Sequence, residues 1–137
     1  MKSRSESLIR LKKFQVDEKR RQVAQIEAMV ADFERMASEL DQQIEIEQQK
    51  TGISDVAHFA YSTFAKAALA RRDNLLASAT DMKETLESAQ DALAEAVEDL
   101  KKVELLDQRE HGREAAAEAK TEQEEYDEIA RLRHMRS

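Results

Sequence analysis

The sequence contains no cysteine, no proline, no tryptophan and only two glycines. Without cysteine the chain can form no disulfide and offers no thiolate ligand to a metal ion, which fits a reducing compartment. Its aromatic residues are two tyrosines and four phenylalanines, so large side chains are too sparse for a compact globular core. The remaining mixture, rich in Ala, Glu, Lys, Leu and Arg, is typical of long helices and coiled coils.

Long apolar runs are also missing. No stretch approaches the ~20 consecutive apolar residues that a membrane-spanning helix requires. The N-terminal stretch MKSRSESLIRLKKF is charged but has no continuous apolar segment, so it does not match a secretory signal. We therefore expect a cytoplasmic protein.

The chain has fewer basic than acidic residues, 22 against 29, and its net charge is −7. This balance argues against a nucleic-acid-binding protein, which needs a basic surface for the phosphate backbone. The charge is unevenly distributed: residues 1–21 carry eight Lys or Arg and three acidic residues, whereas residues 73–110 carry eleven acidic residues and four Lys or Arg. These two segments would attract each other if the chain folded back on itself.

The first 50 residues contain a heptad repeat of apolar residues. Position a is apolar in six successive heptads, and position d holds Ile26, Phe33 and Leu40, although Lys12 and Lys19 occupy earlier d positions. A period of 3.5 residues over this length predicts a coiled-coil helix. We expect it to span about residues 3–50, because Lys50 and Gly52 are typical of a helix C-terminus. The expected core positions are Ile9, Val16, Val23, Ile26, Val30, Phe33, Ala37, Leu40 and Ile44.

A second heptad run begins near residue 65 and predicts a helix of about residues 63–130. Its apolar seam ends near Val103–Leu106, since the next heptad positions hold Asp107 and Glu110. Residues 113–132 are rich in good helix formers but have no clear seam. The members of the second run are Ala65, Ala68, Arg72, Leu75, Ala79, Met82, Leu86, Ala89, Leu93, Ala96, Leu100 and Val103.

Neither helix can bury its apolar stripe alone, and a connector of about residues 51–62 allows the second helix to fold back on the first. We therefore predict an all-α fold with a single domain over residues 1–137, in which two long helices form an antiparallel coiled-coil hairpin. A turn centred near residue 57 would place residue i opposite roughly residue 114 − i. In this register the first helix runs out where the second seam ends, so residues 111–137 overhang.

The same register places the basic N-terminal segment along the acidic stretch of the second helix. The two lysines at d positions, Lys12 and Lys19, are then expected to reach across the seam to Glu95, Glu98 or Asp99. Their aliphatic stems would still cover apolar surface.

No catalytic or metal-binding constellation is present in the sequence. His58, His111 and His134 are too far apart for a ligand set and show no i, i+4 pairing. Acidic pairs such as Glu124-Glu125 lie on a helix expected to be exposed, where no pocket would shift their pKa values for acid–base chemistry. We therefore expect neither an enzyme nor a bound metal or cofactor.

Two stretches are candidate binding surfaces. The first is HFAYSTF, residues 58–64, which holds three of the six aromatic residues. Aromatic side chains here either close the open end of the hairpin or form a patch for a partner, and the sequence leaves both interpretations open. Phe59 and Tyr61 fit the first role, and Phe64, at the start of the second helix, fits the second.

The second candidate surface is the overhang, which ends in YDEIARLRHMR. Tyr126, Ile129 and Leu132 recur there at three-residue spacing, and the basic end suits a helix C-terminus. A solvent-exposed tail needs no such apolar stripe, so the alternative of a frayed tail explains the stretch less well.

These features together resemble the FliJ family of flagellar type III export proteins. The resemblance rests on the basic N-terminal helix, the Y-x-x-F motif of Tyr61 and Phe64, and the D-E-x-A-x-R motif that begins at Asp127. The stretch HFAYSTFAKAALARRDNL is similar to the alphaproteobacterial branch of the family. The resemblance covers essentially the whole chain.

The resemblance implies a two-helix coiled coil similar to the rotor stalk of rotary ATPases. Family members insert their terminal helices into the hexameric flagellar export ATPase, promote its assembly and activity, and link it to the membrane export gate. Some also escort export chaperones. It follows that this chain would associate peripherally with the inner-membrane export apparatus at the flagellar base.

The resemblance also implies site residues. The export-gate contact of the family falls on Phe64, Ala68, Arg71 and Leu75, of which only Phe64 matches the family's residue type. The segment expected to enter the ATPase ring, together with the N-terminal segment, contains Tyr126, Asp127, Glu128, Ile129, Ala130, Arg131 and Arg133.

A generic scaffolding coiled coil that forms a dimeric rod is the alternative function. It accounts for the heptads equally well. It does not explain why the second seam ends in register with the first helix, or why aromatic residues gather at the expected tip.

Overall fold

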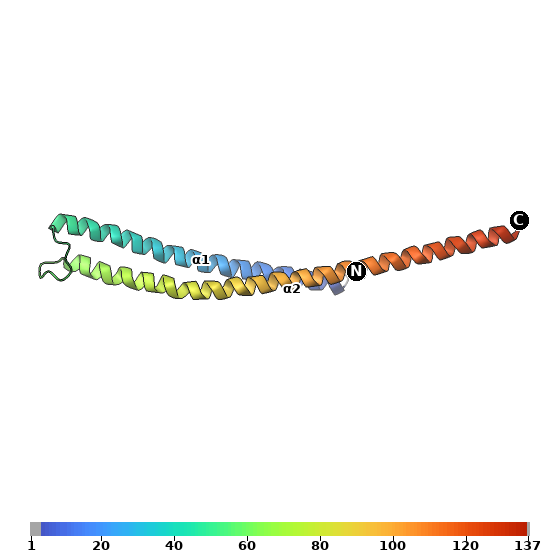
Figure 1. The fold of residues 1–137 in the computed structure, drawn as a ribbon, viewed down its shortest axis with the longest axis horizontal. Coiled ribbons are helices and arrows are strands. Elements are labelled where there is room, and N and C mark those ends of the chain that lie inside the picture. Colours follow the sequence, from blue (N-terminus) through green and yellow to red (C-terminus); the bar gives the residue numbers. More distant parts are fainter. Residues whose placement is uncertain (1–3, 137) are drawn as a thin grey trace. The chain divides into compact units, whose positions relative to one another are not determined.

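The computed structural model describes residues 4–136. Within this range the chain forms two helices, α1 (Arg4–Thr51) and α2 (Thr63–Arg136), and no strand (Figure 1). The predicted all-α fold with a coiled-coil hairpin is therefore confirmed. Residue 3, the expected start of the first helix, lies outside the described residues.

Position a of the α1 heptads forms the most deeply buried part of the fold. Position d alternates with it and is half-buried throughout. This is the burial pattern of a coiled-coil seam, in which each a and d side chain inserts between residues of the facing helix. The buried a residues are Val16, Val23, Val30, Ala37 and Ile44, and Ile9 is half-buried.

All twelve heptad positions expected in α2 are buried or half-buried. Three alanines, Ala65, Ala68 and Ala79, are the buried residues of this helix. Because alanine has a short side chain, the two helix backbones can approach closely at these positions. The half-buried members are Arg72, Leu75, Met82, Leu86, Ala89, Leu93, Ala96, Leu100 and Val103.

The chain divides into two units, Asp17–Glu95 and Met1–Val16 with Ala96–Ser137. In the first unit α2 runs back alongside α1 after the connector (Figure 1). Ion pairs join Arg72 to Asp41 at 2.8 Å and Lys83 to Glu34 at 3.3 Å. The residue numbers in these pairs add up to 113 and 117, which agrees with the expected antiparallel register of about 114.

The second unit pairs the first turns of α1 with α2 in the same register. The Ser5 hydroxyl donates a hydrogen bond of 2.8 Å to the carboxylate of Glu110. Beyond Glu110, every α2 residue to Arg136 is exposed. Residues 111–136 therefore form a single helix segment that no part of α1 in this unit covers.

The expected ion pairs of the two seam lysines are not formed. Lys12 and Lys19 are half-buried, but in the described part of each unit no ion pair joins Lys19 to Glu95, or Lys12 to Glu98 or Asp99. Half-burial is consistent with aliphatic stems that cover the seam while the ammonium groups remain in water. Hydration of two flexible ammonium groups thus outweighs the small gain expected from exposed ion pairs.

Candidate partner-binding surfaces

The connector between the helices is built from two consecutive turns. The Asp55 carboxylate accepts a hydrogen bond from the amide of Ala57, and the imidazole Nδ1 of His58 accepts one from the amide of Ala60, both at 3.0 Å. The backbone adds bonds from His58 to Asp55 and from Tyr61 to His58. Side chains that bond to a backbone amide two residues ahead stabilise such turns. Residues 55–61 are therefore held in one local conformation.

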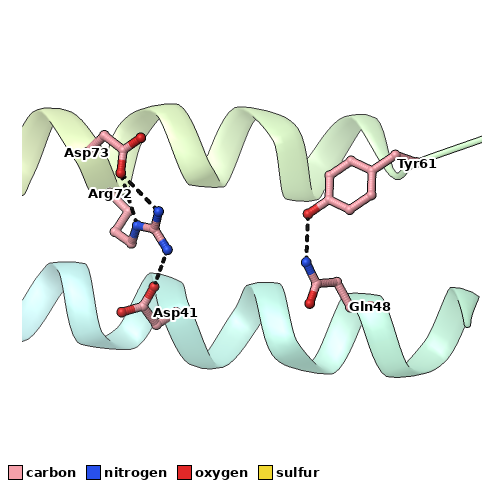
Figure 2. Close-up of polar contacts among 5 residues, drawn as sticks. All are labelled: Asp41, Gln48, Tyr61, Arg72 and Asp73. Atoms are coloured by element: carbon pink, nitrogen blue, oxygen red, sulfur yellow. Dashed lines mark hydrogen bonds and ion pairs between the residues drawn. The ribbon is translucent and has the colours of Figure 1, made fainter. Parts of the chain in front are cut away.

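Tyr61 and Ser62 fasten this connector to the last turn of α1. The Tyr61 side chain is buried, and its hydroxyl accepts a hydrogen bond of 2.9 Å from the side-chain amide of Gln48 (Figure 2). Ser62 donates to the carboxylate of Glu47 at 3.0 Å and accepts from the amide of Ala65 at 3.2 Å. Ser62 is thus the N-cap of α2, since its oxygen satisfies an amide of the first helical turn.

Phe59 does not close the end of the hairpin, contrary to the expectation from sequence. Its side chain is 97% exposed and stacks on His58, with ring centroids 4.8 Å apart. The turns at Asp55 and His58 hold Phe59 on the solvent side of the connector, whereas Tyr61 is buried at the end of the seam. An aromatic residue in a connector has no periodicity, so its sequence position cannot show which way it points.

The four residues of the expected export-gate stripe fall into two environments. Phe64 is 55% exposed and Arg71 is exposed, whereas Ala68 is buried and Leu75 is half-buried in the seam. The heptad explains this division, because Ala68 and Leu75 occupy d positions and Phe64 and Arg71 occupy the flanking g positions. Phe64 and Arg71 are therefore the residues of this stripe that are most open to a partner.

A shallow hollow of about 220 Å³ lies beside this stripe. Its lining comes from both helices: Arg71 and Leu75 of α2, and Met36, Glu39, Leu40 and Gln43 of α1. The contribution of α1 was not expected from the sequence. The sequence does contain a signal for this contribution of α1. Met36 and Gln43 are g positions of the first heptad run, and they face α2 residues 78 and 71 in the expected register.

Arg72 is a charged residue at a seam position. Its guanidinium donates to Asp41 of α1 at 2.8 Å and to Asp73 at 3.0 Å (Figure 2). The hydrogen bond to Asp41, followed by the one to Asp73, raises the pKa of Arg72 above its usual value. The ion pair with Asp41 thus joins the two helices near the connector.

The C-terminal segment expected to contact the ATPase ring is exposed throughout. Two side-chain hydrogen bonds here are local: Arg131 donates to Glu128 at 2.7 Å, and Gln123 donates to Asp127 at 3.0 Å. Ala130 and Arg133 are likewise exposed. Within their unit, none of these residues is brought against residues 4–16 of α1.

Apolar side chains follow this segment to its end. They are 47–75% exposed, and the last of them extends the spacing noted in the sequence. Three residues turn about 300° around an α-helix, so each step drifts by about 60° and the set covers about half of the circumference. These residues are Tyr126, Ile129, Leu132 and Met135.

The start of α1 carries a similar apolar set that the heptads do not include. Leu8, Leu11 and Phe14 are 42–57% exposed and also recur every three residues. They lie outside the a and d positions, and for that reason a search for a coiled-coil seam passes over them.

The histidines do not converge. His111 lies near Asp107 and Glu114, at 3.4 and 3.7 Å, and His58 is part of the connector turn. No group of three or more His, Asp or Glu residues suited to a metal ion is found among residues 4–136. In the same range, neither helix has an apolar stretch long enough to span a membrane.

Comparison with known proteins places the chain in a family. A family model described as "Flagellar FliJ protein" matches residues 1–137, which is the whole chain. No curated protein and no solved structure matches it. The chain therefore belongs to the flagellar FliJ family and is a coiled-coil protein of flagellar protein export.

Proposed function

We propose that the chain is a non-enzymatic stalk of the flagellar export apparatus. It inserts its terminal segments into the hexameric export ATPase, promotes assembly and activity of the ring, and links the ring to the membrane export gate. Through these partners it sits peripherally at the inner membrane of the flagellar base. Export chaperones are further partners in this proposal.

The observation that carries this proposal is the exposed helical segment of residues 111–136. A helix with an uncovered apolar face is suited to a partner that covers this face. Here Tyr126, Ile129, Leu132 and Met135 cover about half of the helix circumference and are exposed. In this proposal the wall of the central opening of the hexameric ring covers this face.

The start of α1 supports the same proposal. Leu8, Leu11 and Phe14 are exposed apolar residues with the same three-residue spacing. Within its unit this segment pairs with α2 through the contact of Ser5 with Glu110. Both terminal segments thus carry apolar surface that the hairpin does not use for its own stability.

The mechanism follows from differential binding. A stalk that contacts several subunits at once binds the assembled ring more tightly than it binds separate subunits. Mass action then shifts the population toward the ring, by a free energy that grows with the ratio of stalk concentration to its dissociation constant. Because the ATPase works as a ring, its turnover rises without any catalytic residue from the stalk.

Truncation tests this function. Removal of residues 113–137 should abolish the stimulation of ATP hydrolysis by the purified export ATPase. The hairpin should remain folded, because the two seams end before residue 111. Circular dichroism and thermal unfolding of the truncated chain provide the control. Undiminished stimulation by the truncated, folded chain would contradict the stalk.

A dimeric scaffold is not favoured by the fold. In each unit α1 covers the apolar seam positions of α2, and α2 covers those of α1, so both seams are buried within a single chain. A second copy is therefore not needed to bury these residues.

A further inference from the structure

The end of the hairpin at which α1 begins has two unlike sides. Within its unit, residues 4–13 of α1 lie along residues 102–111 of α2, in the register of the Ser5 contact with Glu110. In an antiparallel coiled coil the g positions of both helices share one side of the seam, with the c positions next to them. We name this side of the two stretches the c/g face. It consists of Arg4, Leu8 and Leu11 of α1 and Lys102, Leu106 and Arg109 of α2.

The apolar residues of the c/g face are open to solvent. Leu8, Leu11 and Leu106 are 42%, 50% and 61% exposed. In the register, Leu8 and Leu106 are level with each other across the seam, and Leu11 follows on the next turn of α1. The opposite side of the same stretches, made of the b and e positions, has no apolar residue. Its members are Glu6, Arg10, Lys13, Glu104, Gln108 and His111.

Charge is also divided between the two sides. Arg4, Lys102 and Arg109 of the c/g face are exposed, and none of them has an ionic partner in the described part of its unit. The next acidic residue along this side of α2, Asp99, is half-buried. The face thus carries three cations and no acidic residue, although the whole chain has a net charge of −7. The acidic residues of the two stretches lie in the seam or on the opposite side: Glu6, Glu104, Asp107 and Glu110.

Leucines bordered by cations are the surface chemistry of proteins that lie on a membrane. Apolar side chains enter the boundary between lipid headgroups and acyl chains, while Lys and Arg meet the lipid phosphates. Arg4 and Arg109 lie at one end of the c/g face and Lys102 lies at the other, about 10 Å away along the helix axes. Their long side chains reach the phosphates on either side of the three leucines.

We propose that the c/g face binds directly to a bilayer that contains anionic phospholipid. Its leucines enter the interfacial layer of the bilayer, and its three cations pair with lipid phosphates. The contact does not depend on the proposed function, in which the chain reaches the membrane only through protein partners. It adds a lipid contact at the end of the hairpin that lies farthest from the connector.

The seam beneath the face argues against an acidic partner helix. Here the a and d positions of α2 hold Asp107 and Glu110. A helix that entered the seam would bring its carboxylates toward these two residues, and like charges at close range are unfavourable. A bilayer contacts only the outermost side chains, which are the leucines and the cations.

A second copy of the chain fits the face no better. A two-fold interface would bring the same face against itself. The cations of one copy would then meet the cations of the other, with no carboxylate between them.

The bilayer contact and the proposed ring contact exclude each other. Both use Leu8 and Leu11, which cannot be covered by lipid and by the ATPase ring at the same time. The bilayer therefore holds the free chain, and insertion into the ring releases this end from the lipid.

Flotation with lipid vesicles tests the proposal without any export protein. The full chain should float with vesicles of phosphatidylglycerol and phosphatidylethanolamine and stay behind with vesicles of phosphatidylcholine alone. Arg109→Glu should lower the partition coefficient roughly thirtyfold, because each unit of charge near an anionic leaflet changes binding about fivefold. Arg10→Glu is the matched control, since Arg10 is exposed at a b position on the opposite side. It should stay within about threefold of the wild-type chain, because salt screens a charge held away from the leaflet.

A fluorescent reporter tests which side meets the lipid. The chain has no tryptophan, so a single introduced indole gives the whole signal. Leu106→Trp should shift its emission to shorter wavelength with the phosphatidylglycerol vesicles. Leu76→Trp, at an e position of α2 where the leucine is 42% exposed, should show no shift. Circular dichroism and thermal unfolding of every variant confirm that the hairpin is folded.

Each result decides for or against the face. If the wild-type chain does not float with the anionic vesicles, the proposal is wrong and an acidic partner helix is the remaining occupant. If Arg10→Glu loses as much binding as Arg109→Glu, the attraction belongs to overall charge and the c/g face is overturned. An unshifted Leu106→Trp in a chain that floats would also overturn it, and this readout decides even where Arg109→Glu fails to fold.

Discussion

The two tyrosines of the chain have opposite environments. Tyr61 is buried and bonded to Gln48, whereas Tyr126 is 68% exposed. The Tyr61 ring covers the last layer of the seam, and its hydroxyl satisfies a partly buried amide of α1 (Figure 2). This residue therefore joins the connector to the coil, a role that its position in HFAYSTF alone does not reveal.

Removal of one hydroxyl tests this role. Tyr61→Phe should lower the free energy of unfolding by about 1 kcal/mol, because it deletes one part-buried hydrogen bond and keeps the ring. Tyr126→Phe is the matched control and should leave stability unchanged, since that residue is exposed. Urea unfolding followed by circular dichroism measures both. Equal stability of Tyr61→Phe and the wild-type chain would mean that the bond to Gln48 adds nothing to the fold.

Arg72 shows how a charge is accommodated at a seam position. It is held by Asp41 and Asp73, and these hydrogen bonds raise its pKa. A cation whose pKa is higher in the folded chain than in the unfolded chain stabilises the folded state. This stabilisation is fully present at every pH below the usual pKa of the group. The charge of Arg72 therefore adds no pH dependence to stability in the neutral range.

At the scale of elements, the two glycines have opposite roles. Gly52 follows α1 with φ of 74°, and its amide bonds to the carbonyl of Gln48 at 2.8 Å. Glycine is favoured at such a position because other L-residues are strained there. Gly112 lies inside α2 with helical geometry, and no atom lies near the position of an added Cβ.

Alanine substitution should therefore have opposite effects at the two sites. Gly52→Ala should destabilise the hairpin by about 1 kcal/mol through backbone strain. Gly112→Ala should stabilise α2 locally by about 1 kcal/mol, since alanine is the better helix former. Hydrogen exchange of the amides of residues 108–116 would slow in Gly112→Ala, and thermal unfolding would report on Gly52→Ala. Faster exchange in Gly112→Ala would show that residue 112 acts as a hinge that requires glycine.

The seam could be predicted from sequence because a heptad depends only on residue spacing. Val16, Val23, Val30 and Ile44 are buried where that spacing places them. The ion pair of Arg72 with Asp41 could not be predicted in the same way, because it requires the register to within one residue. The exposure of Phe59 was missed because side-chain bonds at Asp55 and His58 shape the connector locally.

The hollow beside Arg71 and Leu75 marks another limit of prediction from spacing. The gate stripe was expected on α2 alone, from Phe64 to Leu75. Its α1 neighbours Met36 and Gln43 become evident only when the two heptads are aligned antiparallel. A surface shared by two helices depends on both registers at once, whereas a seam can be recognised in each helix separately.

At the scale of the whole molecule, each unit buries its seam within one chain. Ala68 and Ala79 are buried by the facing helix, and Val23 and Val30 of α1 are covered in return. A homodimeric rod would instead need two chains to cover each seam. Association and stability are linked in a dimer, so its unfolding temperature rises with concentration.

Light scattering and thermal unfolding over a range of concentrations separate these cases. We expect a mass of one chain, 15.7 kDa, and an unfolding temperature that does not change between about 5 and 500 μM, because no binding equilibrium contributes. Within residues 4–136, the exposed residues 111–136 are the one long stretch of helix without a seam, so weak association should disappear in the chain truncated after residue 112. A mass of two chains that persists after this truncation, with an unfolding temperature that rises with concentration, would favour the dimeric scaffold. The stalk requires the first outcome, since a hairpin already closed by its own helices leaves its C-terminal segment available to the ATPase ring.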